Sequence, residues 1–227
     1  MIVSINQPAY MPWLGYFDRV AKSDMHIVLD NVQFEKNSVT NRNKLRTPSG
    51  WTWLSVPILK KGRFGDLEIN KIEVESSKPW CKKHFGTITA NYSRAPFYSK
   101  YADFFEDFYS QNWKFLNPML KESTEYFIQE LGIDTERVSS SKFSIKSKKS
   151  QLILDLCKEV GATTYLSGPF GRDYLDEQEF EDVGIELEFH DYVHPNYKQN
   201  FDGFEPYMSV IDLLFNHGDE SLEVLRS

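Results

Sequence analysis

Cysteine is scarce in this chain of 227 residues, and thiol chemistry is correspondingly limited. The two cysteines, Cys81 and Cys157, lie far apart in different helical patterns. The lack of a Cys-x-x-Cys pair argues against a thiolate zinc site. Cys157 falls on an apolar helix face, where a cysteine is more often a core residue than a nucleophile. We therefore expect two free thiols in a reducing cytoplasm.

Long apolar runs and an excess of positive charge are missing as well. No segment approaches the roughly 20 apolar residues of a membrane-spanning helix. Asn6-Gln7-Pro8 interrupts the first apolar run, so the N-terminus does not resemble a signal peptide. The formal net charge of -7 disfavours DNA, a large tRNA surface and anionic membranes as partners. These features predict a cytoplasmic protein without a membrane span.

Familiar catalytic signatures are also absent. The sequence has no Gly-x-Ser-x-Gly elbow, no Walker A loop and no Rossmann Gly-x-Gly-x-x-Gly pattern. His190 and His194 are four residues apart, but 185–189 is typical of a strand and Pro195 breaks any helix, so no metal site is predicted. Either imidazole is still a candidate general base, since histidine titrates near neutrality.

Alternating strands and helices are what the sequence does contain. Apolar runs and helical spacings of three and four predict the following order: strand 2–5, helix 12–22, strand 25–29, strand 51–58, strand 69–74, helices 80–92, 98–113 and 117–131, strand 136–143, helix 149–160, strand 163–166, a short helix opening at Asp176, and strand 185–189. No element is predicted in the polar stretch from Glu35 to Arg46, and 59–66 is expected to be an exposed loop.

This order predicts an α/β fold, Rossmann-like, with a mostly parallel sheet and helices on both faces. We expect a single domain over residues 1–227, in which 79–131 forms a helical insertion or subdomain. Aromatic residues make up 15% of the chain, enough for both a core and a stacking pocket.

Ligands of such sheets bind at the carboxyl ends of strands. The loop after the first strand carries Asn6, Gln7 and Tyr10, whose polar groups can bind a sugar or an amino acid, although turn capping and ring packing explain them equally well. Asp30 ends the second predicted strand, where it is a candidate general base, partner for an amino group or metal ligand; the alternative is that it caps a helix or turn.

Two further segments carry groups that bind phosphate. Arg42 is flanked by Asn41 and Asn43, and its guanidinium can bind a phosphate through two hydrogen bonds; the alternative is a solvated loop. The segment 167–173 follows a strand and resembles phosphate-binding loops in general form, with candidate residues Ser167, Gly168, Gly171 and Arg172.

Several of these segments resemble the WbqC-like family, and the resemblance covers nearly the whole chain. The matching segments are 6–17, 30–34, 41–44, 165–168, 171–176 and 209–216. Family members place a histidine before the Gln-Pro pair where this chain has Asn6, so base chemistry is not assigned to position 6. The strand–loop–helix start also resembles nucleotide-binding α/β folds of the HUP type.

The resemblance implies a role with O-antigen, the polysaccharide of lipopolysaccharide, and with other surface polysaccharides. Our leading hypothesis is an acyl- or aminoacyltransferase, for example a glycyltransferase, that modifies the amino group of a nucleotide-linked sugar. Gln7, Tyr10 and Tyr16 would line the pocket, Trp13 would stack on a ring, and Asp30, assisted by Gln7 or His190, would carry the proton chemistry. Substrate would be bound by Asn6, by Arg42 with its neighbours Asn41 and Asn43, and by Ser167, Gly168, Gly171 and Arg172 of the segment 167–173.

The expected cosubstrate is acyl-CoA or another activated, carrier-bound acyl donor, with no tightly bound cofactor. One alternative is an ATP- and Mg²⁺-dependent ligase or nucleotidyltransferase on the same fold. Another is a non-catalytic protein that binds sugar nucleotides, whose helical middle segment would suit a partner or a homodimer.

Overall fold

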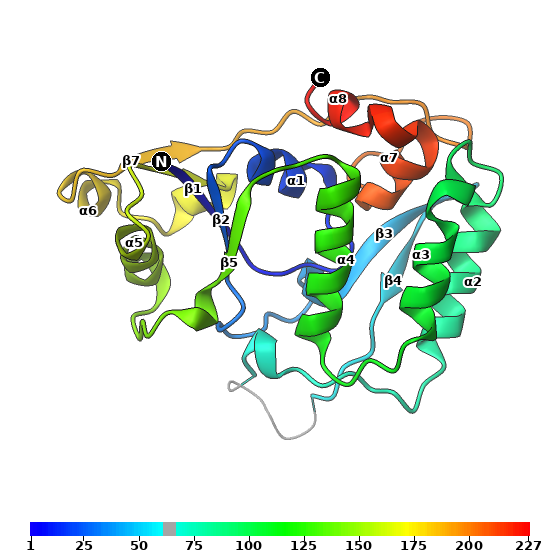
Figure 1. Ribbon diagram of the computed structural model, residues 1–227, viewed down its shortest axis with the longest axis horizontal. Helices are drawn as coiled ribbons and strands as arrows, with labels where there is room; N and C mark the ends of the chain where they lie inside the picture. The colour runs from blue at the N-terminus through cyan, green and yellow to red at the C-terminus, as the bar shows by residue number, and fades with distance from the viewer. Residues whose placement is uncertain (61–66) are drawn as a thin grey trace. The chain divides into compact units, whose positions relative to one another are not determined.

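The computed structural model describes residues 1–60 and 67–227, so most of the loop expected at 59–66 lies outside the described residues. Its contacts divide the chain into two compact units (Figure 1). We call the first the sheet unit, formed by 1–7, 15–31 and 133–193. The second, the hairpin unit, is formed by 8–14, 32–132 and 194–227. The helices predicted at 79–131 belong to the hairpin unit.

The sheet unit is built on five strands that all run parallel in the order β5-β2-β1-β6-β7. The strands are β1 (Ile2–Asn6), β2 (Met25–Val28), β5 (Glu136–Ser139), β6 (Thr164–Ser167) and β7 (Glu186–Phe189). Numbered within this sheet, the order is 3-2-1-4-5, which is the doubly wound order of Rossmann-like folds. The predicted α/β fold with a mostly parallel sheet is therefore confirmed.

Helices cover both faces of this sheet. Right-handed crossovers place α1 (Leu14–Ala21), which joins β1 to β2, opposite α5 (Lys149–Glu159) and α6 (Glu177–Glu181). Figure 1 shows α1 on one side of the strands and the two later helices on the other. Asp176 caps α6 as expected, because its carboxylate accepts a hydrogen bond from the Gln178 amide at 3.0 Å.

The hairpin unit combines a two-stranded antiparallel sheet with helices. Its strands are β3 (Arg42–Thr47) and β4 (Gly50–Ser55), and its helices are α2 (Trp80–Tyr92), α3 (Tyr98–Ser110), α4 (Leu116–Glu130), α7 (Val210–His217) and α8 (Ser221–Leu225). None of the helices within 1–60 and 67–227 has the length and apolarity to cross a membrane.

Two sequence predictions in this unit were wrong or incomplete. The strand predicted over 69–74 is a 3-10 turn, Ile69–Lys71, followed by an isolated bridge from Val74 to Ile58. Strand β3 was missed because Leu45 is the single large apolar residue on its buried face, so the alternation that identifies a half-buried strand is weak.

A buried polar cluster joins the sheet to α1. Ser4 of β1 lies beside His26 of β2 in register, and its Oγ is 2.9 Å from His26 Nδ1. The Tyr16 hydroxyl of α1 lies 3.3 Å from His26 Nε2. His26 is fully buried, and its burial, together with the charges of Arg19 and Arg137, lowers its pKa to about 3. The imidazole is therefore neutral and hydrogen-bonded inside the core.

This neutral histidine makes stability depend on pH. In the unfolded chain His26 titrates near 6.5, so between about pH 6.5 and 3 the unfolded state binds a proton that the folded state excludes. The free energy of unfolding should then fall on acidification, by up to about 1.4 kcal/mol per pH unit from this residue. Urea unfolding of wild type and His26→Gln between pH 7.5 and 4.5 measures the difference in slope.

We expect His26→Gln to be less stable at pH 7.5 but to lose less stability on acidification than wild type. His217→Gln is the matched control for removal of an imidazole, since His217 lies in a partly exposed position of the hairpin unit. Equal slopes for wild type and His26→Gln would contradict the buried neutral imidazole.

Candidate functional site

The strand order of the sheet unit reverses between β1 and β6, and this switch point is where open α/β sheets bind ligands. Ser4 pairs with Leu166 in the parallel register. Continuing the register by two residues places Asn6, at the end of β1, beside Gly168, which follows β6. The polar segments predicted from sequence after these two strands therefore meet at one edge of the sheet.

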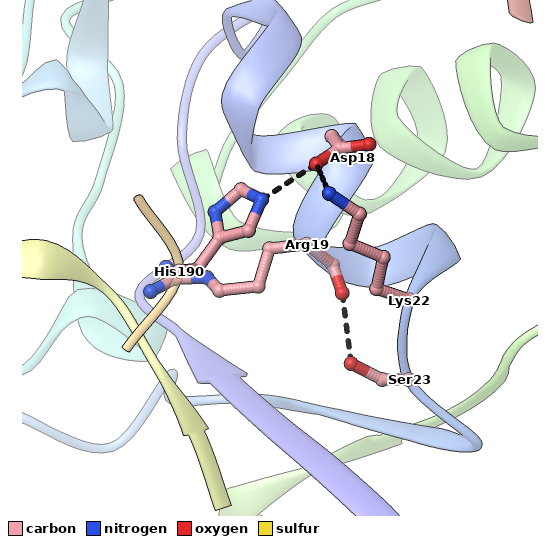
Figure 2. Close-up of polar contacts among 5 residues, drawn as sticks. All are labelled: Asp18, Arg19, Lys22, Ser23 and His190. Carbon is pink, nitrogen blue, oxygen red and sulfur yellow. Dashed lines mark hydrogen bonds and ion pairs between the residues drawn. The ribbon is translucent and has the colours of Figure 1, made fainter. Parts of the chain in front are cut away.

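Helix α1 supplies a carboxylate that holds a histidine at this edge. Asp18 is fully buried, and its Oδ2 lies 2.6 Å from His190 Nε2 and 2.7 Å from Lys22 Nζ (Figure 2). His190 directly follows β7 and is 7% exposed. Its backbone N–H donates to the Ser167 carbonyl at 2.8 Å, which fixes the imidazole at the carboxyl end of the sheet.

The charge of Asp18 determines which nitrogen of His190 carries a proton. Burial alone would raise the pKa of Asp18, but hydrogen bonds from His190 and Lys22 outweigh it and lower the pKa. Asp18 is therefore an ionised acceptor at neutral pH, so the proton of the short contact resides on His190 Nε2. In a neutral imidazole this leaves the lone pair on Nδ1, the arrangement of a general base oriented by a carboxylate.

Arg19, the next residue of α1, brings a positive charge to the same edge. A Cβ atom built on Gly168 would lie 2.2 Å from its Nη1, so the guanidinium lies directly against the backbone that follows β6. Burial lowers the pKa of Arg19, and the neighbouring Tyr165, Tyr16 and Tyr174 oppose that effect. Among the described residues no carboxylate forms an ion pair with this guanidinium, and its Nε has no hydrogen-bond partner there.

Three buried polar atoms of these residues lack hydrogen-bond partners within the described parts of the chain. They are Asn6 Nδ2, Arg19 Nε and Asp18 Oδ1, two donors and one acceptor. Buried polar groups are nearly always satisfied by protein, water or ligand, so unsatisfied donors beside an unpaired cation are the pattern of an anion site. We call Asn6, Asp18, Arg19, Gly168 and His190 the switch-point site.

Other predicted residues of the sheet unit lie around this site with different contacts. Gln7 is half-buried, and no hydrogen bond of its side chain to a described residue is present. Ser167 packs against Gly171, where an added Cβ would lie 2.1 Å from its Oγ. Arg172 is exposed and forms two hydrogen bonds with the Asp191 carboxylate, at 2.8 and 2.7 Å, so its guanidinium is engaged by an acid.

Asp30 has the contacts of a capping residue. Its carboxylate accepts hydrogen bonds from Ser140 Oγ at 3.2 Å, Ser141 N at 3.0 Å and Ser141 Oγ at 2.9 Å. It follows β2, so β1 and β6 separate its strand from the strand that ends at His190. A catalytic role stays a prediction for Asp30 and for His190.

The remaining predicted residues belong to the hairpin unit. Tyr10 is fully buried and bonded to His84 and Tyr109. Trp13 stacks on His194 with ring centroids 6.5 Å apart. The other three lie on or beside β3 and donate to backbone carbonyls: Asn41 to Val56, Arg42 to Asn37 and Asn43 to Met11. Tyr16, in contrast, contacts His26 in the sheet unit.

The sequence reasoning missed Asp18 and Arg19. A signal for Asp18 was present, because it lies at the helical spacing of the apolar face defined by Leu14, Phe17 and Ala21. A carboxylate on the buried face of a helix needs a partner. In the described residues no group of three or more His, Cys, Asp or Glu side chains gathers as a metal would require.

Comparison with known proteins supports one assignment. The WbqC-like protein family matches residues 7–224. The "Uncharacterized protein Rv1507c" of Mycobacterium tuberculosis (strain ATCC 25618 / H37Rv) is 36% identical over 229 residues, covering 99% of this chain and 97% of that protein. No solved structure matches the chain. The chain therefore belongs to the WbqC-like protein family.

Proposed function

We propose that this protein transfers an acyl or aminoacyl group, such as glycyl, to the amino group of a nucleotide-linked sugar. The observation that carries the proposal is the Asp18–His190 pair beside the unpaired Arg19 at the switch point of the sheet. Membership of the WbqC-like family suggests a role in polysaccharide biosynthesis. An activated acyl thioester is the donor that this arrangement needs, because none of the three groups activates a free carboxylic acid.

In this reaction His190 acts as the general base. Its Nδ1 accepts a proton from the neutral attacking amine, whose nitrogen forms a bond to the acyl carbon while the carbon–sulfur bond breaks. The departing thiolate then takes the proton back from His190. Asp18 stabilises the imidazolium that exists between these two proton transfers and keeps the ring in position.

Arg19 and Asn6 bind the anionic part of the substrate. The Arg19 Nε–H and the Asn6 Nδ2–H are donors without partners in the described structure, so a phosphate oxygen would satisfy both while neutralising the guanidinium. Burial strengthens such a contact because little water competes for it. Two adjacent residues of α1 therefore have the two roles: Arg19 binds the negative charge of the nucleotide-linked sugar, and Asp18 positions the base.

The base is tested by His190→Gln and Asp18→Asn. With a panel of nucleotide-linked amino sugars and acyl-CoA donors, product mass gives kcat and KM for the pair that reacts. We expect each substitution to lower kcat by roughly 10²–10⁴ with a small change in KM, because proton transfer is lost and binding is not. Asp191→Asn is the control, since Asp191 adjoins His190 but is exposed and paired with Arg172.

Wild-type kcat in His190→Gln would remove His190 from the mechanism. If product forms only with glycine, ATP and Mg²⁺, and never with a thioester, the reaction is an ATP-dependent ligation and the transfer proposal is wrong.

The anion site is tested by Arg19→Met. Removing an unpaired buried charge relieves its desolvation cost, so the thermal unfolding midpoint without ligand should stay the same or rise. Affinity for the nucleotide-linked sugar should fall by about 10- to 100-fold, as expected for loss of a charge-assisted hydrogen bond. Isothermal titration calorimetry and a thermal melt measure the two effects, and Arg172→Met is the control on the exposed, paired arginine. Unchanged affinity in Arg19→Met would refute the anion role.

A further inference from the structure

The hairpin unit contains a pocket of its own, with a volume of about 370 Å³. It is lined by one segment that includes most of β4 and by another that includes the start of α2, and the lining side chains include Trp53, Lys78, Trp80, Lys83 and His84. This volume is within the range of small-molecule sites. None of these residues belongs to the switch-point site.

Two tryptophans give the pocket an aromatic wall. Trp53 is 38% exposed, and the Arg42 guanidinium lies over its ring at 4.3 Å from the centroid. Trp80 is nearly buried and packs edge-on against His84, with centroids 5.2 Å apart. Tryptophan faces stack on nucleobases and on sugar rings, and such stacking tolerates different bases. Holding Trp53 under Arg42 orders its ring before any ligand arrives.

The charge of the pocket is positive although the chain is acidic overall. Lys78 and Lys83 line it, and no acidic side chain is among the lining residues. Neither lysine forms an ion pair, within 4.0 Å, with any residue that the structure describes. At longer range the charge of Lys78 helps to lower the pKa of Glu75, whereas Lys83 has no acidic neighbour of this kind in the described residues. Against a formal net charge of -7, two such lysines in one pocket indicate an anionic occupant.

Polar contacts fix the inner wall. His84 is 4% exposed, and its Nδ1 lies 2.9 Å from the Tyr10 hydroxyl, which is itself bonded to Tyr109. Burial lowers the pKa of His84 to about 4, so its ring is neutral and adds no charge. The ring is anchored from behind by two buried tyrosines, and the pocket is therefore held by the core of the unit.

We infer that this pocket is a second ligand site, which binds a nucleoside diphosphate with its base on Trp53 and its phosphates on Lys78 and Lys83. A nucleoside diphosphate joins a planar base to a negatively charged diphosphate. The aromatic wall suits the base, and the two lysines suit the diphosphate. The inference does not rest on the acyl-transfer proposal, because it uses no residue of the switch-point site.

The test is calorimetric titration of ADP and UDP, with inorganic pyrophosphate as the ligand that lacks a base. Arg19→Met serves as the background, so that binding at the switch-point site does not contribute. Trp53→Ala and Lys83→Gln should each weaken nucleotide binding by about tenfold or more. The matched controls are Trp51→Ala, an exposed neighbour on β4, and Lys82→Gln, a neighbour on α2; neither lines the pocket.

The site would be supported if nucleotide affinity falls in the two pocket variants and is retained in both controls. Pyrophosphate should bind more weakly than either nucleotide and should be insensitive to Trp53→Ala. The inference is overturned if neither nucleotide binds the Arg19→Met protein at millimolar concentration, or if the controls lose as much affinity as the pocket variants. Pyrophosphate binding as tight as ADP would also overturn it, because the aromatic wall would then contribute nothing.

Discussion

The hydrogen bond between Asp18 and His190 is the interaction on which the proposed site depends. It joins the first helix of the sheet unit to the residue that follows its last strand, 172 positions later in the chain. A buried carboxylate is costly without partners, and here His190 and Lys22 keep it ionised. The same contact turns the imidazole so that one nitrogen is occupied and the other is left to react.

Several buried polar groups around this pair have no hydrogen-bond partner in the described residues. In a core with a purely structural role such groups would be hydrogen-bonded to one another. Arg19 Nε, Asn6 Nδ2 and Asp18 Oδ1 are buried without partners in the described residues, and the Arg19 guanidinium lies against the backbone of Gly168. Such arrangements reduce stability and are typical of binding sites, where ligand completes the hydrogen bonds. Ser4 and His26, one layer deeper, show the contrasting case of a buried polar pair that is satisfied.

Much of the fold was predictable because its elements have clear local periodicity. Helix α2 was placed at its observed ends, and β1, β2, β6 and β7 to within a residue or so, since each has a strong apolar pattern. Strand β3 was missed because one of its faces carries the basic side chains of Arg42, Lys44 and Arg46, and the other holds a buried asparagine beside Leu45. His190 was predicted as a base, but its partner was not, because the two residues are 172 positions apart; the place of Asp18 on the apolar face of α1 showed that it needs a partner, but not which one. Arg19 looked like a surface residue of a helix, whereas in the structure its Nε is buried and its guanidinium lies against Gly168.

A crystal structure of the protein with a nucleotide-linked amino sugar tests the central claim most directly. The account predicts a phosphate oxygen within hydrogen-bond distance of Arg19 Nε and the sugar amine within reach of His190 Nδ1, with the Asp18 contact retained. A sugar amine that lies against Asp30, with Arg19 still unpaired, would contradict it.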